Sequence, residues 1–166
     1  MDDRLKTLIG RTALVAVLLV LSEPSFLRAT ETRMTVREDA VLTEVNRVRA
    51  EHGLAALHGD ARLVRAARGH SSEMVATQTF EHGRFWVRIE HQGVTSGRLG
   101  ETLGWSAPVN GSVSRIVSRW LTSPEHRAIV LSPVYRAVGV GISIGPFMNR
   151  PEAVVVTADY LAPVSQ

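Results

Sequence analysis

The first clear helical pattern lies between residues 35 and 53. Thr35 and Glu38 have the spacing of a capping box, in which each side chain binds the backbone of the other at the start of a helix. The apolar positions that follow recur at three- and four-residue intervals: Val41, Leu42, Val45 and Val48. Gly53 supplies a stop, because glycine is common just beyond a helix C-terminus. The pattern predicts an amphipathic helix whose apolar stripe faces the core.

Three further helices are predicted downstream. Asp60 is expected to cap one that ends near Gln78, and Ser112 is expected to cap another. The latter must stop before Pro124, because the residue before a proline disfavours helical backbone. A short helical stretch containing Phe85, Trp86 and Ile89 lies between them and runs to Gly93. The inward-facing positions are Leu63, Ala66, Ala67, His70 and Met74 in the first of the three, and Val113, Ile116, Val117, Trp120 and Leu121 in the last.

The periodicity changes toward the C-terminus. Ala137–Ile144 and Ala153–Leu161 are rich in Val and Ile and are joined by a loop with glycine and proline, which predicts a hairpin. Leu99–Trp105 is expected to be a strand broken by Gly100 and Gly104. Helices come first and strands later, without regular alternation of the two. This order predicts an α+β fold in which helices pack on a small antiparallel sheet.

Composition narrows the chemistry. The 166 residues contain no cysteine, which excludes disulfide scaffolds, thiolate nucleophiles, zinc ribbons and iron–sulfur sites. Any metal ion would have to bind histidine and carboxylate. The net charge is only +3, and the sequence holds no basic run of the kind that follows phosphates, so a nucleic-acid partner is not expected.

Residues 1–29 have the regions of an export signal. Basic residues precede the apolar run Ala13–Leu21, and Pro24 and small residues follow up to Ala29. The run is short for a bilayer core of roughly 30 Å. We therefore expect cleavage after Ala29 and a secreted domain, extracellular or periplasmic, with no transmembrane span in its mature form. Leu27 is larger than the residue preferred near a cleavage site, so an uncleaved, membrane-tethered form stays an alternative.

Candidate chemistry comes from six histidines, because the chain contains none of the common nucleotide-binding, metalloprotease or hydrolase motifs. His70 lies on an apolar helix stripe, where a hydrogen-bonded core histidine is expected. His82 and His126 each follow a predicted helix closely, where side chains can converge on a cleft. The remaining three, at helix ends or in loops, are expected to be solvated: His52, His58 and His91.

Six short segments in order resemble one family. They are Asn46-Arg47-Val48-Arg49 with Gly53-Leu54, Phe80-Glu81-His82, Gly100-Glu101-Thr102, Trp120 to Arg127, Val138-Gly139-Val140-Gly141, and Asp159-Tyr160. In this arrangement the chain resembles the CAP superfamily, also called SCP-like extracellular domains, in its cysteine-free bacterial branch. The resemblance covers roughly residues 40–161, which we assign to the domain. Residues 30–39 are then a linker with the first cap, and residues 162–166 are a tail.

The resemblance implies an α–β–α sandwich whose central cleft gathers two histidines and two acids. His82, Glu101 and His126 match three of these positions. Ser123 stands where the second acid would be, and Thr102 replaces the usual asparagine. Any activity that needs the full set of four is therefore in doubt.

Two interpretations of this cleft stay open. His82, Glu101 and His126 suit an open site for a divalent ion, zinc or calcium, but they can equally hydrogen-bond one another and hold the cleft together. Ser123 directly precedes Pro124 without the turn that exposes a nucleophile, so it is expected to end a helix rather than attack a substrate.

The leading function is a secreted binding module for a lipid or other small hydrophobic ligand, or for a protein partner, as the resemblance implies. The alternative is a metal-dependent or His/Glu-assisted hydrolase that uses the same cleft. Trp120, Trp86 and Phe80 are expected in the core or the cleft wall. Arg127 is expected to pair with Glu125 or Glu101.

Overall fold

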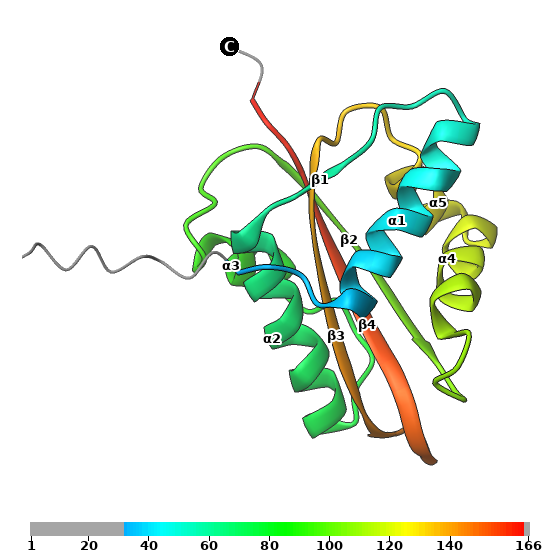
Figure 1. Cartoon of the computed structure of the whole chain (residues 1–166). Helices are drawn as coiled ribbons and strands as arrows, with labels where there is room; N and C mark the ends of the chain where they lie inside the picture. Colours follow the sequence, from blue (N-terminus) through cyan, green and yellow to red (C-terminus); the bar gives the residue numbers. More distant parts are fainter. Residues whose placement is uncertain (1–31, 165–166) are drawn as a thin grey trace, which may run out of the picture.

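A computed structural model describes residues 32–164, so the export signal predicted over residues 1–29 lies outside the described part of the chain. The described residues form five helices and four strands (Figure 1). In chain order they are α1 (Val36–Glu51), β1 (His58–Gly59), α2 (Ala61–Thr77), α3 (Phe85–Glu90), β2 (Arg98–Ser106), α4 (Ser112–Thr122), α5 (Pro124–Val130), β3 (Ala137–Phe147) and β4 (Arg150–Ala162). Helices α2 and α3 cover one face of the sheet, and α1, α4 and α5 cover the other. The predicted α–β–α sandwich of class α+β is confirmed.

Helix α1 forms as the pattern predicts. The Thr35 backbone N–H donates to Glu38 Oε2 over 2.7 Å, and the Glu38 N–H donates to Thr35 Oγ1 over 3.3 Å. This reciprocal pair is the expected capping box, and it places the start of α1 inside the segment assigned to the linker. Gly53 follows the helix with φ of +70°. The whole predicted stripe is buried: Val41, Leu42, Val45 and Val48.

The sheet has the strand order β1-β3-β4-β2. Strands β3 and β4 form the predicted antiparallel hairpin, and both are longer than expected because the turn is confined to Met148 and Asn149. Both turn residues have positive φ, which suits a tight two-residue hairpin turn. Strand β1 was not predicted. Its two residues pair in parallel with β3, where His58 lies opposite Ala137.

Strand β2 corrects the expectation of a broken strand. It runs without interruption from Arg98 to Ser106 and pairs with β4 throughout. Gly100 and Gly104 are places of close packing instead of breaks. A Cβ at Gly100 would lie 2.5 Å from the hydroxyl of Tyr135, and a Cβ at Gly104 would lie 2.5 Å from a methyl of Ile116.

Close approach also fixes α2 on the sheet. A Cβ at Gly139 would lie 2.0 Å from the carbonyl carbon of Leu63, and one at Gly141 would lie 2.2 Å from that of Ala67. Helix backbone therefore packs directly on the bare backbone of β3, as Figure 1 shows for the course of α2 along that strand. This contact holds the layer that carries α2 and α3 at a short distance from the sheet.

The region after residue 110 differs in two details from the prediction. Gly111, with φ of +68°, occupies the N-cap of α4, and Ser112 is the first helical residue and makes no cap with its side chain. The helix ends before Pro124 as expected, but Pro124 then begins α5, because proline is favoured in the first turn of a helix. Of the five predicted inward residues of α4, three are buried and Val113 and Leu121 are partly buried.

Candidate functional site: a cleft at the free edge of the sheet

Three of the four predicted cleft residues, His82, Glu101 and His126, meet at the free edge of β2; the fourth is Ser123. His82 comes from the loop before α3, Glu101 from β2 itself, and His126 from the first turn of α5. His126 therefore lies inside a short helix and not just beyond one, as the sequence had suggested. Their side chains border a cavity of about 370 Å³. The cavity is lined by His82, Phe85, Arg98, Leu99, Gly100, Glu101, Glu125, His126, Ile129 and Tyr135.

Glu101 holds two other side chains of the region in place. Its carboxylate is fully buried, and Oε1 lies 2.7 Å from Nδ1 of His82, whose side chain is 48% exposed. Nη2 of Arg88 donates to the other oxygen over 2.5 Å, and Nη1 of the same residue donates to the carbonyl oxygen of His82 over 3.0 Å. Glu101 thus binds both the imidazole and the helix behind it.

His126 faces His82 across the cavity mouth. The two ring centroids are 6.1 Å apart, with 55° between the ring planes. Burial lowers the pKa of His126 below its ordinary value, and the neighbouring His82 lowers it further, against a smaller opposite effect of Glu125. A neutral imidazole is therefore favoured at this position, and it offers one donor and one acceptor.

The three candidate metal ligands come together, but Glu101 is already engaged by two partners. Both of its oxygens already bind neighbours, and Nδ1 of His82 is taken by the same carboxylate. Among residues 32–164, no group of three or more His, Cys, Asp or Glu side chains is arranged to hold a metal ion. The bonds to His82 and Arg88 leave the two imidazoles as the less engaged ligands, and the zinc or calcium site stays a prediction.

Ser123 joins two helices outside the cavity. Its N–H donates to the carbonyl of Arg119 at the end of α4, and its carbonyl accepts from the N–H of Arg127 in α5. It therefore ends a helix, as expected. Ser123 was also predicted as a cleft residue, but it is not among the residues that line the cavity. Within the described part of the chain, the one hydroxyl that lines the cavity belongs to Tyr135, and it donates to the carbonyl of Leu99 over 3.1 Å.

The expectation that Arg127 pairs with Glu125 or Glu101 was wrong. Arg127 is exposed and forms no ion pair within residues 32–164, and Arg88 takes the place at Glu101. No sequence pattern indicates this choice, because Arg88 lies on a short helix without a recognisable motif. It is brought to β2 only by the packing of α3 over the sheet.

The three aromatic residues singled out from the sequence have different positions. Trp120 is buried, as expected, and its indole N–H donates to the carbonyl of Leu103 over 2.7 Å. Trp86 and Phe80 are 50% and 39% exposed and do not line the cleft, which corrects the expectation. The aromatic wall of the cleft is Phe85 instead.

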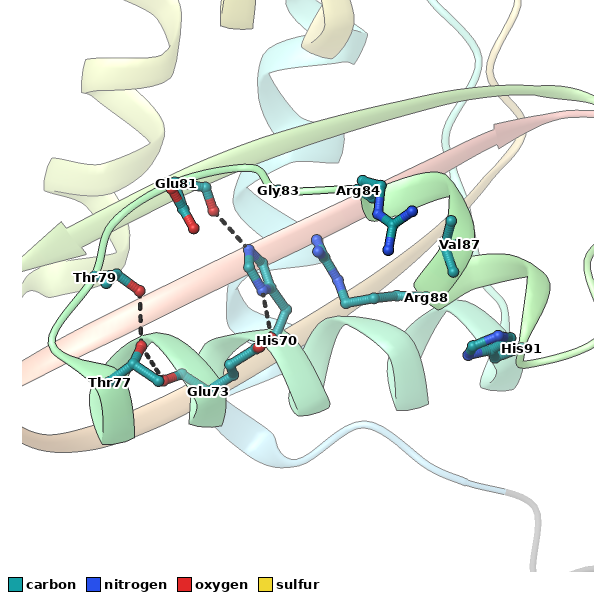
Figure 2. Close-up of a pocket in the computed structure, with 10 residues that line it drawn as sticks. All are labelled: His70, Glu73, Thr77, Thr79, Glu81, Gly83, Arg84, Val87, Arg88 and His91. Carbon is teal, nitrogen blue, oxygen red and sulfur yellow. Dashed lines mark hydrogen bonds and ion pairs between the residues drawn. The ribbon is translucent and has the colours of Figure 1, made fainter.

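The other histidines lie as expected. His70 is buried, and Nε2 bonds the carbonyl oxygen of Glu81 over 2.9 Å. Figure 2 shows it in a second hollow, of about 420 Å³, between α2, the loop before α3, and α3 itself. Arg88 also lines this hollow, so it separates the hollow from the cleft. The three histidines predicted to be solvated are exposed: His52, His58 and His91.

One residue beside the site was not noticed as a functional candidate. Asp159 of β4 lies directly opposite Glu101 in the register of β2 and β4 and is completely buried. The sequence showed it only as half of an Asp-Tyr pair near the end of a strand. Nothing in that pattern indicates which acid it faces across the sheet.

Comparison with known proteins identifies the family of the chain. The family model of the cysteine-rich secretory proteins, CAP, matches residues 42–160, and the chain belongs to this family. The chain is 33% identical over 113 residues to the uncharacterized membrane protein YlbC of Bacillus subtilis (strain 168), a match that covers 65% of this chain and 32% of that protein. It is 28% identical over 109 residues to the uncharacterized protein YkwD of the same organism, covering 63% of this chain and 41% of the relative. The chain thus matches less than half the length of either.

Solved structures show the same fold. An extracellular protein with an SCP domain from Bacillus anthracis superposes with a TM-score of 0.60 at 21% identity, covering 78% of this chain and 44% of that one. An outer surface protein from Borrelia burgdorferi superposes with a TM-score of 0.58 at 19% identity, covering 78% and 96%. Of the helices in residues 32–164, none is long and apolar enough to span a membrane.

Proposed function

We propose that the cleft binds a small amphipathic ligand outside the cell. The observation that carries this proposal is the two-sided lining of the cavity of about 370 Å³. Phe85, Leu99 and Ile129 supply apolar side chains, and the neighbouring rings of His82 and His126 supply polar nitrogen atoms. The charged side chains in the lining are those of Arg98, Glu101 and Glu125. Apolar lining with a few convergent polar groups is the usual character of a small-molecule site.

The polar end of the cleft suits a head group that exchanges hydrogen bonds. The charge of Glu101 is compensated by Arg88, so the buried carboxylate does not repel an acidic group strongly. His126 is favoured in its neutral form and can donate or accept. A carboxylate or hydroxyl head on a short apolar body meets both requirements.

Binding is preferred to hydrolysis because the cavity offers no activated nucleophile. The pair of His82 and Glu101 has the geometry that orients an imidazole base. However, the Tyr135 hydroxyl is occupied by a backbone carbonyl, and Ser123 lies outside the cavity lining. A hydrolase would therefore need to activate water directly through His82 or His126.

The site of action is proposed from two independent sources. Residues 1–29 have the pattern of an export signal, and the solved relatives include an extracellular and an outer surface protein. One curated relative is described as a membrane protein, which suits the alternative in which the signal is kept as a tether. Both forms place residues 40–161 outside the cytoplasm.

The test uses two amphipathic probes, anilinonaphthalene sulfonate and octanoate. We expect the fluorescence of the first to rise on binding to the chain and to fall again when octanoate competes. Phe85→Ala removes the aromatic wall and should weaken both effects at least tenfold. Phe80→Ala removes an exposed phenylalanine outside the cavity and should change neither. Equal effects of the two variants, or no competition by octanoate, would overturn the proposal.

A further inference from the structure

A second carboxyl group lies beside Glu101. Asp159 of β4 pairs with Glu101 of β2 in the antiparallel register, so the two side chains leave the sheet on the same face. Asp159 is 0% exposed, and neither of its oxygens accepts a hydrogen bond from any described residue. An ionised carboxylate in that position would be costly, because a buried charge needs partners.

Among residues 32–164, no side chain around Asp159 donates a hydrogen bond to its carboxyl group. From α3, Arg88 gives its Nη2 to Glu101 and its Nη1 to the carbonyl of His82, and its Nε has no partner. From β3 the facing residue is Gly139, which has no side chain. From α2 the buried titratable group is His70, and its two nitrogens face Glu81 and Glu73 (Figure 2).

Protonation of Asp159 would remove the cost of a buried carboxylate that accepts no hydrogen bond. Two carboxyl groups that share a buried site cannot both be ionised without a large penalty. Burial raises the pKa of Asp159 well above its ordinary value, and the charge of Glu101 raises it further, against a smaller opposite effect of Arg88. A protonated carboxyl carries one O–H donor, and each carboxylate oxygen of Glu101 can accept two hydrogen bonds although it now accepts one.

We propose that Asp159 is a positioning residue of the cleft, a carboxylic acid that donates a hydrogen bond to Glu101 and fixes it against Arg88 and His82. This role rests on the proposed function, since the geometry that it fixes is that of the binding cleft. An ionised Glu101 in turn holds the Nδ1–H tautomer of His82. Nε2 of His82 is then left as a hydrogen-bond acceptor for a hydroxyl of the ligand, and a carboxylate head would take its hydrogen bond from neutral His126.

The protonation is tested on the full chain with carbon-13 in the side-chain carboxyls of aspartate. At neutral pH we expect one aspartate carboxyl resonance in the position of a protonated acid, and its loss in Asp159→Asn. Asp60→Asn is the matched control. Hydrogen bonds from Arg62 lower the pKa of Asp60, so that variant should remove an ionised resonance. A wild-type spectrum in which every aspartate is ionised at neutral pH would overturn the proposal without any variant.

The positioning is tested by the Nδ1–H proton resonance of His82. Asp159→Asn keeps a donor in its amide group and should leave this resonance and its exchange rate unchanged. Asp159→Leu removes the donor and should speed exchange at least tenfold. A leucine variant with unchanged exchange, or an asparagine variant with the same loss, would contradict the positioning role, and if the leucine variant does not fold, the wild-type spectrum and the asparagine variant still decide. Both measurements are made without ligand, so they stand apart from failure of the probes to bind.

Discussion

Nδ1 of His82 and Oε1 of Glu101 lie 2.7 Å apart although the residues are 19 positions apart in the chain. The bond ties the loop before α3 to the edge strand of the sheet. Arg88 reinforces it by binding the other oxygen of Glu101 and the carbonyl of His82. Glu101 is therefore as much a structural link as a cleft residue, and its removal should be felt in stability as well as in binding.

Glu101→Gln keeps the shape of the side chain but removes its charge. The guanidinium of Arg88, only 20% exposed, then loses its counterion. We expect the free energy of unfolding to fall by about 3 kcal/mol, as when one partner of a buried pair is removed. Urea denaturation gives this value. Glu125→Gln, an exposed acid on the same cleft, is the control with an expected change below about 0.5 kcal/mol, and equal losses in the two variants would count against the account.

The lowered pKa of His126 predicts a pH dependence. Its folded-state pKa lies below the ordinary value of 6.5, so the unfolded chain binds the proton more readily. The stability that neutral His126 supports is fully present above the ordinary pKa of 6.5. It is lost as the pH falls from there through the lower folded-state pKa. We expect the thermal midpoint of the wild type to fall on acidification from pH 7.5 to 5.5, and that of His126→Gln to fall less. Equal falls would refute the assignment.

Substitution of two glycines by alanine should have opposite effects on stability, one through close packing and the other through helix propensity. Gly139→Ala places a Cβ 2.0 Å from the backbone of Leu63, so α2 must shift from the sheet, at a cost of about 3 kcal/mol. Gly69 lies exposed on α2 with no atom near its would-be Cβ. Gly69→Ala should instead stabilise the chain by up to about 1 kcal/mol. Urea unfolding of both variants checks the opposite signs, and a stable Gly139→Ala would show that the close contact is not required.

Zinc offers a direct test of the cleft as a metal site. Because Glu101 is engaged by His82 and Arg88, two imidazoles are the ligands left over. Calorimetry should therefore show no stoichiometric zinc binding to the chain at neutral pH. Stoichiometric heat that disappears in His126→Ala would show that Glu101 leaves its partners for the ion, and would renew interest in a hydrolase.

Local sequence signals predicted much of the fold. The capping box at Thr35, the cap at Asp60 and the Val-rich hairpin all depend on neighbours within a few positions, and each is present in the structure. Helix α5 and strand β1 were missed because each is too short to show a period. The predicted breaks at Gly100 and Gly104 were wrong, because a glycine that interrupts a strand and a glycine that allows close packing of another side chain cannot be distinguished in the sequence.

The site was predicted in part. His82 and His126 were singled out by their positions beside predicted helices, Glu101 was added through resemblance to a family, and the structure brings all three to one cavity. Arg88 and Asp159 were not predicted as site residues, because their roles depend on contacts with Glu101 that packing and strand pairing create. Register and helix packing decide those contacts, and neither can be deduced from the residues near them in the chain.

The central claim is that His82 and His126 form the polar end of one binding site. Nitrogen-15 spectra of the six imidazoles during an octanoate titration test it most directly, because four histidines lie outside the cavity and serve as internal controls. We predict that the signals of His82 and His126 shift together and saturate, while His52, His58 and His91 stay unchanged. Shifts at those three exposed histidines, or none at His82 and His126, would contradict the account.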